Sequence, residues 1–270
     1  MRTIRDGLLI LVGLSILSGC GGRASSSRNL FDIQRLTYVR QTDEPQVIEV
    51  ALPVAIDVES FGGDVIINVD EELEVATITV RRVAMHGPTR KEEAEASLAD
   101  IDYRAEVVPG QLGQVLRVRL WTTHGEPHFQ RADLRIDVPA VDGVFVRTER
   151  GDVVAINIEG VVDIANRRGD VRIMTNLAMR RKVTIINSEG DIEYRVRGES
   201  TGIFDCIAAG GRVEHHISYG KFTIAPNRRK GRLQAALNRG DNTITLRTED
   251  GNIKIAVVAD PTDIGTAIFP

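Results

Sequence analysis

The chain has 270 residues, of which 42% are hydrophobic and 27% charged, a balance typical of a folded protein and not of a disordered one. Its net charge of −4 and its few aromatic residues (one Trp, four Tyr, seven Phe) argue against the basic surfaces and stacking platforms of nucleic-acid-binding proteins. Two cysteines cannot build a disulfide framework or a structural zinc site. We therefore predict no nucleic-acid partner and no cofactor.

The N-terminus carries the pattern of an export signal. Two arginines precede an apolar run at residues 7–17, which is shorter than the roughly 20 residues that a helix needs to span a bilayer. The run leads into Leu-Ser-Gly-Cys at residues 17–20, which resembles a bacterial lipobox, where the cysteine is lipidated before cleavage. We predict a signal peptide over residues 1–19 and a lipid on Cys20.

The next segment predicts a tether and a location. Residues 21–29 are rich in Gly and Ser, a composition typical of flexible linkers, and we assign residues 20–42 to the lipidated cysteine and its tether. Because Gly21, and not Asp, follows Cys20, the resemblance to lipoproteins of two-membrane bacteria favours the outer membrane. We expect an exported protein anchored to the cell envelope by its lipid, in the outer membrane where the organism has one.

Residues 43–140 predict an N-terminal β region with one short helix. Polar and apolar residues alternate, as in half-buried strands, at 47–50, 75–80, 114–122 and 132–138. The spacing of Thr89 and Glu92 fits a capping box, and the helix formers that follow predict a helix near residues 89–101. Residues 60–67 already look like the glycine turns of the C-terminal half.

Residues 141–258 repeat a glycine turn about every 20 residues. Full turns begin at glycines 151, 169, 190, 211, 231 and 251. The second and fourth residues after most of these glycines are apolar, and the residue between them is mostly polar. This alternation indicates short strands with one buried face.

The repeat favours a coiled arrangement of these strands. A single turn cannot bury its own apolar face, but stacked turns of a β-solenoid share one core. An antiparallel sandwich of hairpins also fits the strand spacing. Gly-Asp followed by Val or Ile recurs at 151–153, 169–171 and 190–192, which favours the solenoid because equivalent positions of a coil stack on one another. We predict an all-β fold, a repetitive β-solenoid of about 20 residues per turn, with residues 259–270 as a C-terminal cap or tail.

Residues 132–153 carry a family resemblance. Here a strand ending in Val-Pro is followed by another strand and by Thr-x-x-Gly-Asp-Val. This pattern resembles a bacterial family of candidate adhesins, whose repeat-rich β-solenoid domains occur in exported and envelope proteins. The similarity covers about residues 45–258, and it departs from the pattern where a basic residue replaces the Asp, at Arg212, Lys221 and Arg232. The resemblance implies a solenoid and brings no catalytic residues.

Several acids follow the turn glycines: Asp64, Asp152, Asp170, Asp191 and Asp241. Such a series is similar to the calcium-binding β-roll, in which hard oxygen ligands suit Ca²⁺. The β-roll, however, needs Gly-Gly-x-Gly-x-Asp, and this chain has one glycine per turn and no second acid. Because Asp favours turns through local hydrogen bonds of its side chain, we interpret these residues as turn formers.

Two further motifs contain chemically active side chains, but we predict no site at either of them. His124 and His128 lie four apart around Glu126, a spacing that would bind zinc on a helix, but Gly125 and Pro127 indicate a loop and no third ligand is apparent. We therefore predict no metal site.

Cys206 and His215 occupy the same inward position in successive half-turns and could form a nucleophile with its base. The equivalent positions are apolar in nearly every other turn, which predicts burial and an inert thiol. We predict no catalytic residues.

Three basic clusters lie at the predicted corners of the coil: Arg167-Arg168, Arg180-Arg181-Lys182 and Arg228-Arg229-Lys230. Aligned on one edge, they could bind an anionic envelope polymer or lipid head groups. The alternative is that they are solvated corners that discourage association between sheet edges.

These observations predict a non-enzymatic, envelope-anchored lipoprotein with an adhesin-like binding or scaffolding surface. Its partner would be repetitive, an anionic envelope polysaccharide or a protein. One alternative is a carbohydrate-active parallel β-helix enzyme, which would gather carboxylates in one cleft beside an aromatic residue. The other is a self-assembling structural solenoid.

Overall fold

The computed structural model describes residues 38–263, apart from residues 88, 112, 227 and 228. The predicted signal peptide, the lipid site at Cys20 and the basic residue Arg228 lie outside the described residues. Within the part of the chain that is described, no helix has the length and apolar character needed to cross a bilayer.

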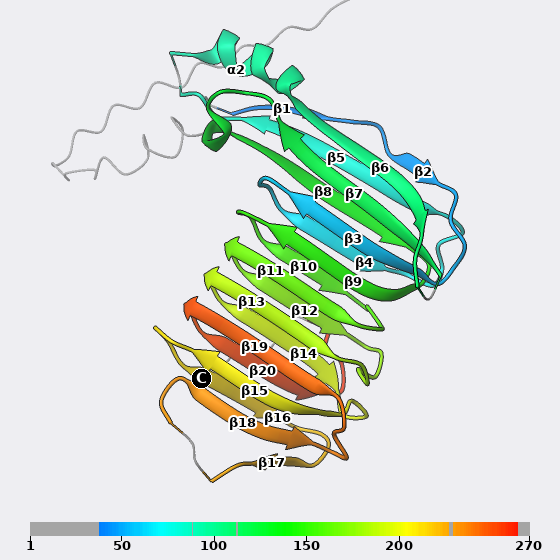
Figure 1. The fold of residues 1–270 in the computed structure, drawn as a ribbon, viewed down its shortest axis with the longest axis vertical. Helices are drawn as coiled ribbons and strands as arrows, with labels where there is room; N and C mark the ends of the chain where they lie inside the picture. The colour runs from blue at the N-terminus through cyan, green and yellow to red at the C-terminus, as the bar shows by residue number, and fades with distance from the viewer. Residues whose placement is uncertain (1–37, 88, 112, 227–228, 264–270) are drawn as a thin grey trace, which may run out of the picture. The chain divides into compact units, whose positions relative to one another are not determined.

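Two sheets share one hydrophobic core (Figure 1). In spatial order, sheet A contains β1 (Val39–Thr42), β5 (Ala76–Ala84), β8 (Gln130–Val138), β4 (Val65–Val69), β10 (Val153–Ile156), β12 (Val171–Thr175), β14 (Ile192–Arg197), β20 (Ile253–Val258) and β16 (Val213–Ile217), with β2 (Gln46–Ile48) paired to β5. Sheet B contains β17 (Phe222–Ile224), β18 (Arg232–Leu237), β15 (Gly202–Ala208), β19 (Thr243–Asp250), β13 (Val183–Glu189), β11 (Val162–Arg168), β9 (Val141–Thr148), β3 (Val54–Ser60), β7 (Gln114–Thr122) and β6 (Ile101–Pro109).

The central strands form the predicted β-solenoid. The chain runs along a strand of sheet B, turns at a glycine, and returns along a strand of sheet A, as in β9–β10, β11–β12 and β13–β14. Successive turns pair in parallel and in register, so Val153 lies beside Val171, and Val171 beside Ile192. These inward side chains are fully buried. The alternation therefore places one apolar face of each sheet against the other and confirms the solenoid over the sandwich of hairpins.

The order of the last turns differs from the chain order that the glycine spacing suggests. The C-terminal turn, β19–β20, lies between β13–β14 and β15–β16, so Ile253 pairs with both Ile192 and Val213. Strands β17 and β18 run antiparallel to their neighbours and add no further parallel turn at Gly231. Glycine spacing sets the length of a turn, but the alternating pattern is the same for parallel and antiparallel neighbours, so it does not fix which turns meet.

The N-terminal region extends both sheets. Strands β3 and β4 form a solenoid turn, as the pattern at residues 60–67 predicts, because Val65 pairs in register with Val153. Beyond this turn β8 runs parallel to β4 and β7 runs parallel to β3, whereas β5 pairs antiparallel with β8 and β6 pairs antiparallel with β7. Both sheets continue across residue 140, since β9 pairs with β3.

The predicted helix is present as α2 (Lys91–Ser97), followed by the short 3₁₀ helix η1 (Leu98–Asp100). The predicted capping box is wrong. The N-cap is Arg90, and no side chain makes a capping hydrogen bond there. Ala94 and Leu98 are instead buried in the common core, so tertiary packing holds the helix in place.

The described end of the C-terminal segment lies on the outer face of sheet A. Arg195, on β14, is only 3% exposed and donates hydrogen bonds to the carbonyls of Pro261 (2.8 Å) and Asp263 (2.9 Å). The Asn176 side chain donates to Thr262 Oγ1 at 2.6 Å. Residues 260–263 therefore form a strap over the face of the sheet, and residues 264–270 lie outside the described part.

Candidate functional site

The turn carboxylates form a ladder that runs along the solenoid. A side-chain oxygen of each accepts a hydrogen bond from the backbone N–H of the equivalent residue in the neighbouring turn or strand. The sequence predicted, instead, a local hydrogen bond within the same turn. The donor-to-acceptor pairs are Asp64 to Asp133 (3.1 Å), Asp152 to Asp64 (3.0 Å), Asp170 to Asp152 (2.8 Å), Asp191 to Asp170 (2.8 Å), Asn252 to Asp191 (2.8 Å) and Arg212 to Asn252 (3.2 Å). Hydrogen bonding between turns thus explains the recurring acid without a bound calcium ion.

The ladder also explains two departures from the repeat. The backbone amide of Arg212 donates to Asn252 at the last described step of the ladder. Among the described strands of sheet A none lies beyond β16, so residue 212 needs no side-chain acceptor and can be basic. Asp241 follows a glycine but lies outside the ladder, because the C-terminal turn of this column begins at Gly251 and Asn252.

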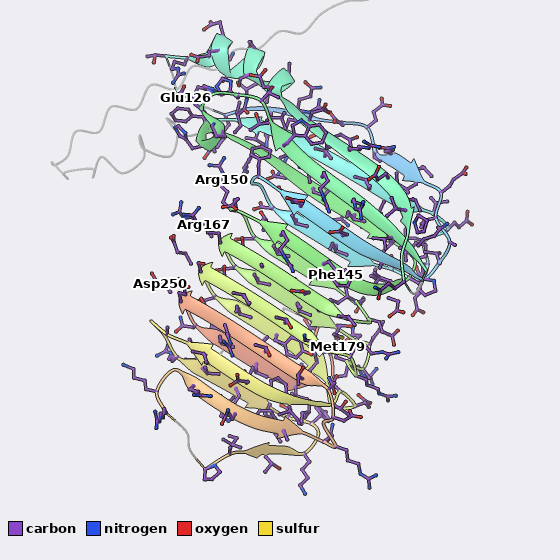
Figure 2. The ribbon with its side chains drawn as sticks, viewed as in Figure 1. Glu126, Phe145, Arg150, Arg167, Met179 and Asp250 are labelled. Atoms are coloured by element: carbon purple, nitrogen blue, oxygen red, sulfur yellow. The ribbon has the colours of Figure 1, made fainter. Side chains whose placement is uncertain are left out.

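The basic clusters do not gather on one edge. Arg167 and Arg168 end β11, on the rim where strands of sheet B pass into sheet A, whereas Arg180, Arg181 and Lys182 precede β13 on the opposite rim. Figure 2 shows the two rims, marked by Arg167 and by Met179. Arg229 and Lys230 precede β18, which runs antiparallel to β15, and so they lie on the rim of Arg167 but several strands away.

The clusters also differ in their charge pairing. Arg167 pairs with Glu149 (3.3 Å) and Arg168 with Glu189 (2.7 Å), and all four side chains are exposed. Within the described residues, Arg180, Arg181 and Lys182 make no ion pair and are exposed. An exposed ion pair contributes little to the free energy of folding, so a role in stability explains neither the paired cluster nor the unpaired one.

A shallow groove of about 670 Å³ lies on the outer face of sheet B. Its walls come from the ends of β3, β7, β9 and β11, where the parallel register brings outward side chains into rows. Trp121 stands at the end of β7 with 39% of its surface exposed. The other residues that define it here are Phe61, Glu59, Arg119, Arg147, Glu149 and Arg167.

The charges in the groove are paired. Arg119 contacts Glu59 at 2.9 Å, Arg167 contacts Glu149, and Arg147 contacts Asp163 at 3.0 Å. Arg167 is one of the predicted binding residues, whereas no binding role was predicted for Trp121. The alternation of residues 114–122 contained the signal, since Leu120 points inward and its neighbour Trp121 must therefore point outward among charged residues.

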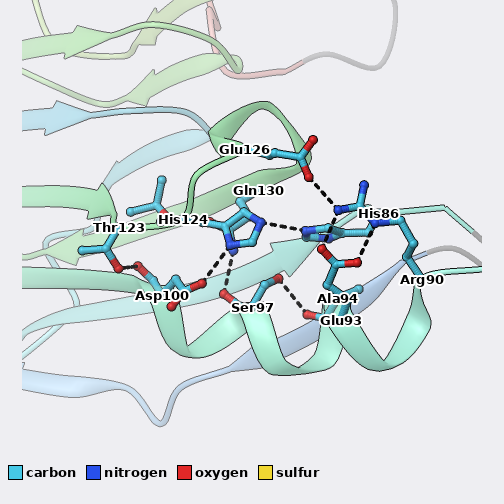
Figure 3. A network of polar contacts seen from close by, with 11 residues as sticks. His86, Arg90, Glu93, Ala94, Ser97, Asp100, Thr123, His124, Glu126 and Gln130 are labelled. Atoms are coloured by element: carbon cyan, nitrogen blue, oxygen red, sulfur yellow. Dashed lines mark hydrogen bonds and ion pairs between the residues drawn. The ribbon is translucent and has the colours of Figure 1, made fainter.

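A second polar cluster brings together residues that are remote in the sequence (Figure 3). His86 follows β5, Glu93 lies on α2, and His124 follows β7. One ligand atom from each lies within 4.8 Å of the others, and the two Nε2 atoms of His86 and His124 are 3.1 Å apart. The predicted histidine pair was His124 with His128, but His128 instead packs against Phe129, with the two rings tilted and 4.1 Å between their centroids.

Charged neighbours surround this cluster. Arg90 hydrogen-bonds to Glu93 and to Glu126, and these bonds lower the pKa of both carboxyl groups. Burial, with the nearby His124 and Arg90, lowers the pKa of His86, which is 4% exposed. The network therefore favours a neutral His86 imidazole beside the ionised carboxylates of Glu93 and Glu126.

Cys206 is fully buried in β15, as predicted, and burial raises the pKa of its thiol. His215, on the edge strand β16, stacks on Phe222 with 5.7 Å between ring centroids. Because a buried, protonated thiol is a poor nucleophile, this pair offers no catalytic centre.

A family model described as Toastrack DUF4097 matches residues 54–256. The chain is similar in fold to a candidate cell adhesion protein from Clostridium sporogenes, with a TM-score of 0.56 and 11% identity over 82% of this chain and 100% of that one. A candidate adhesin from Bacteroides fragilis aligns with a TM-score of only 0.29 and 10% identity, over 82% of this chain and 97% of the other.

At these identities the first solved structure supports the fold alone, and the second carries no argument. Comparison with curated proteins gave no match. The family model, by contrast, spans most of the chain, from the first solenoid strand into the C-terminal one, and it includes the helix and every named strand except β1 and β2. The chain therefore belongs to the Toastrack DUF4097 family of β-solenoid domains.

Proposed function

We propose that this protein is a non-enzymatic, envelope-anchored binding protein that holds an acidic polysaccharide in the groove beside Trp121. The observation that carries the proposal is the exposed indole next to Arg119, Arg147 and Arg167 on one sheet face. The lipid on Cys20 would anchor the domain, and the tether would give it reach. The description of the Clostridium sporogenes protein as a candidate cell adhesion protein supports an adhesin-like role at the cell surface.

The groove offers the two kinds of contact that an acidic sugar polymer requires. An indole face packs against the apolar C–H face of a sugar ring, and it is already ordered, so little conformational entropy is lost on binding. Guanidinium groups bind carboxylate or sulfate oxygens through paired hydrogen bonds. Arg119, Arg147 and Arg167 could exchange their present carboxylate partners for those of the ligand.

The solenoid suits a repetitive partner. Outward side chains recur at the spacing of paired strands, about 4.8 Å, so a polymer lying across the strands meets several similar sites. Many weak contacts of this kind add up through multivalency. Arg168 lies next to Arg167 on the same rim and would extend the basic path. Arg229 and Lys230 lie on that rim but several strands away, and Arg180, Arg181 and Lys182 lie on the opposite rim, so these five are not included.

The carboxylates in the groove favour binding over cleavage. Glu59 and Glu149 lie near Trp121, as an enzyme of the alternative class would require, but each is held by an arginine. Glycoside cleavage by paired carboxylates needs both carboxyl groups turned toward the scissile bond, whereas these two face their arginine partners.

The test uses the protein without its lipid, residues 21–270, with polygalacturonate as the acidic polysaccharide and dextran as the neutral one. Retained protein and released fragments are recorded together at low and high salt. We expect retention on polygalacturonate only, lost at high salt, with no fragments. The Trp121→Ala variant should bind at least tenfold more weakly.

Tyr219→Ala is the matched control, since Tyr219 is a 53% exposed aromatic residue outside the groove. Equal weakening by both variants, or no retention at all, would reject the groove. Fragments in the wild-type reaction would reject the non-enzymatic assignment.

A further inference from the structure

The cluster of His86, Glu93 and His124 has no part in the proposed polysaccharide groove. It lies where the end of β5, the helix α2 and the loop after β7 meet (Figure 3). His86 is buried, Glu93 is largely exposed, and His124 is partly buried, so the cluster has an inner and an outer side. Two imidazoles and a carboxylate are a ligand set that divalent transition metals use.

The spacing of the two imidazole nitrogens fits a shared ion. Bonds of 2.0–2.1 Å at a tetrahedral angle place two zinc-bound nitrogens about 3.3 Å apart. The Nε2 atoms of His86 and His124 lie 3.1 Å apart, and a carboxylate oxygen of Glu93 lies within 4.8 Å of both. Ligand atoms at these distances can reach a common centre through small side-chain rotations.

A neighbouring carboxylate orients one of the imidazoles. His124 Nδ1 lies 2.9 Å from Asp100 Oδ2, so the ring donates its Nδ1–H to that carboxylate. The Nε2 lone pair of His124 then faces His86 Nε2 at hydrogen-bond distance, and a metal ion between the two nitrogens would replace the proton of that contact. A carboxylate behind a histidine in this way is the usual second layer of zinc sites, where it fixes the ring and makes it a better ligand.

The charges around the cluster match a divalent cation. Its network contains the carboxylates of Glu93, Asp100 and Glu126 and a single guanidinium, that of Arg90. The network thus holds two more acidic groups than guanidinium groups. Arg90 occupies both oxygens of Glu93, but each carboxylate oxygen has a second lone pair that can bind a metal.

We propose that His86 Nε2, His124 Nε2 and one oxygen of Glu93 bind a divalent transition metal ion of the Zn²⁺ class. Three protein ligands leave a fourth position, which lies on the exposed side of Glu93 and would hold water. The ion would join three elements at the end of the sheets where β5, α2 and β7 meet. Because it binds the folded state, it would also stabilise the domain.

Isothermal titration of the purified, chelator-treated protein with Zn²⁺ tests the proposal, together with the visible spectrum of the Co²⁺ form. We expect one ion per chain and a rise in melting temperature. Glu93→Gln, on the exposed helix face, should weaken binding at least tenfold without disturbing the fold. Asp100→Asn should weaken it 10- to 100-fold, the usual effect of losing such a second-layer partner.

His216→Gln is the control, because His216 is an exposed histidine on the edge strand β16, away from the cluster. It should keep the wild-type affinity and the Co²⁺ spectrum. Absence of Zn²⁺ binding to folded wild-type protein would overturn the proposal. So would binding that survives in both Glu93→Gln and Asp100→Asn, since the ion would then lie elsewhere.

Discussion

At the scale of single residues, the solenoid is held by positions whose role reaches into the next turn. Gly169 has φ of 123°, and a Cβ there would lie 2.3 Å from the carbonyl oxygen of Gly151, so only glycine fits this column. Beside it, Asn166 donates from its amide to the carbonyls of Gly151 and Gly169 at 3.1 Å each. Glycine therefore allows the close approach of successive turns, and the Asp and Asn side chains satisfy backbone groups between them.

The Asp ladder leads to a prediction about its chemistry. Asp170→Ala removes the acceptor for the amide of Asp191 and should lower the free energy of unfolding by about 1–2 kcal/mol. Asp170→Asn keeps an acceptor oxygen, as Asn252 does in the same column, and should change stability by less than about 0.5 kcal/mol. Urea unfolding followed by circular dichroism measures both.

Asp241→Ala serves as the comparison, because Asp241 follows a glycine outside the ladder. It should be close to neutral. If Asp170→Asn instead proved as damaging as Asp170→Ala, the negative charge would matter more than the acceptor, and a bound cation such as Ca²⁺ would become the better explanation.

At the scale of elements, the C-terminal segment closes the fold in two ways. Strand β20 enters the interior of sheet A, between β14 and β16, and the strap at residues 260–263 then crosses the outer face. The strap supplies carbonyl acceptors to the buried guanidinium of Arg195. The segment thus covers the outer face of sheet A. Its removal would destabilise the fold because these hydrogen bonds would be lost.

We predict that deleting residues 259–270 lowers the free energy of unfolding by about 1–3 kcal/mol, because Arg195 loses two carbonyl partners while buried. The association state of the truncated protein in light scattering should match that of the full chain. Arg195→Met in the full chain tests the cause, since its effect and that of the deletion should not add. Filaments formed by the truncated protein would show that the segment blocks the end of the stack.

At the scale of the whole described domain, each turn contacts mainly its neighbours, so stability should be greatest in the middle of the stack. α2 packs at the N-terminal end. At the other end the antiparallel strands β17 and β18 close sheet B, while sheet A ends in the parallel edge strand β16 (Figure 1). Antiparallel and helical ends interrupt the parallel ladder, which lowers the tendency of sheet edges to associate.

Hydrogen exchange measures this gradient. We expect the slowest amide exchange in β10, β12, β14 and β20 of sheet A and in the paired strands of sheet B, and the fastest in β1, β2 and β17. Uniform protection from end to end would contradict the nearest-neighbour picture and indicate a single cooperative unit.

The elements whose cause is local could be predicted from the order of residues. Alternating residues set which side chains face inward, and the glycine and Asp columns set the turn length, so the solenoid and the burial of Cys206 follow from the order of residues alone. Both patterns act between positions a fixed distance apart, which a single sequence displays directly.

The neighbours of each turn and the distant residues that gather at one place could not be predicted in this way. The insertion of β19–β20 between earlier turns, the splitting of the basic clusters over two rims, and the meeting of His86 with His124 all depend on strand pairing. A strand's alternation is the same in every register and on either side of a neighbour, so the choice is made by the packing of the whole core.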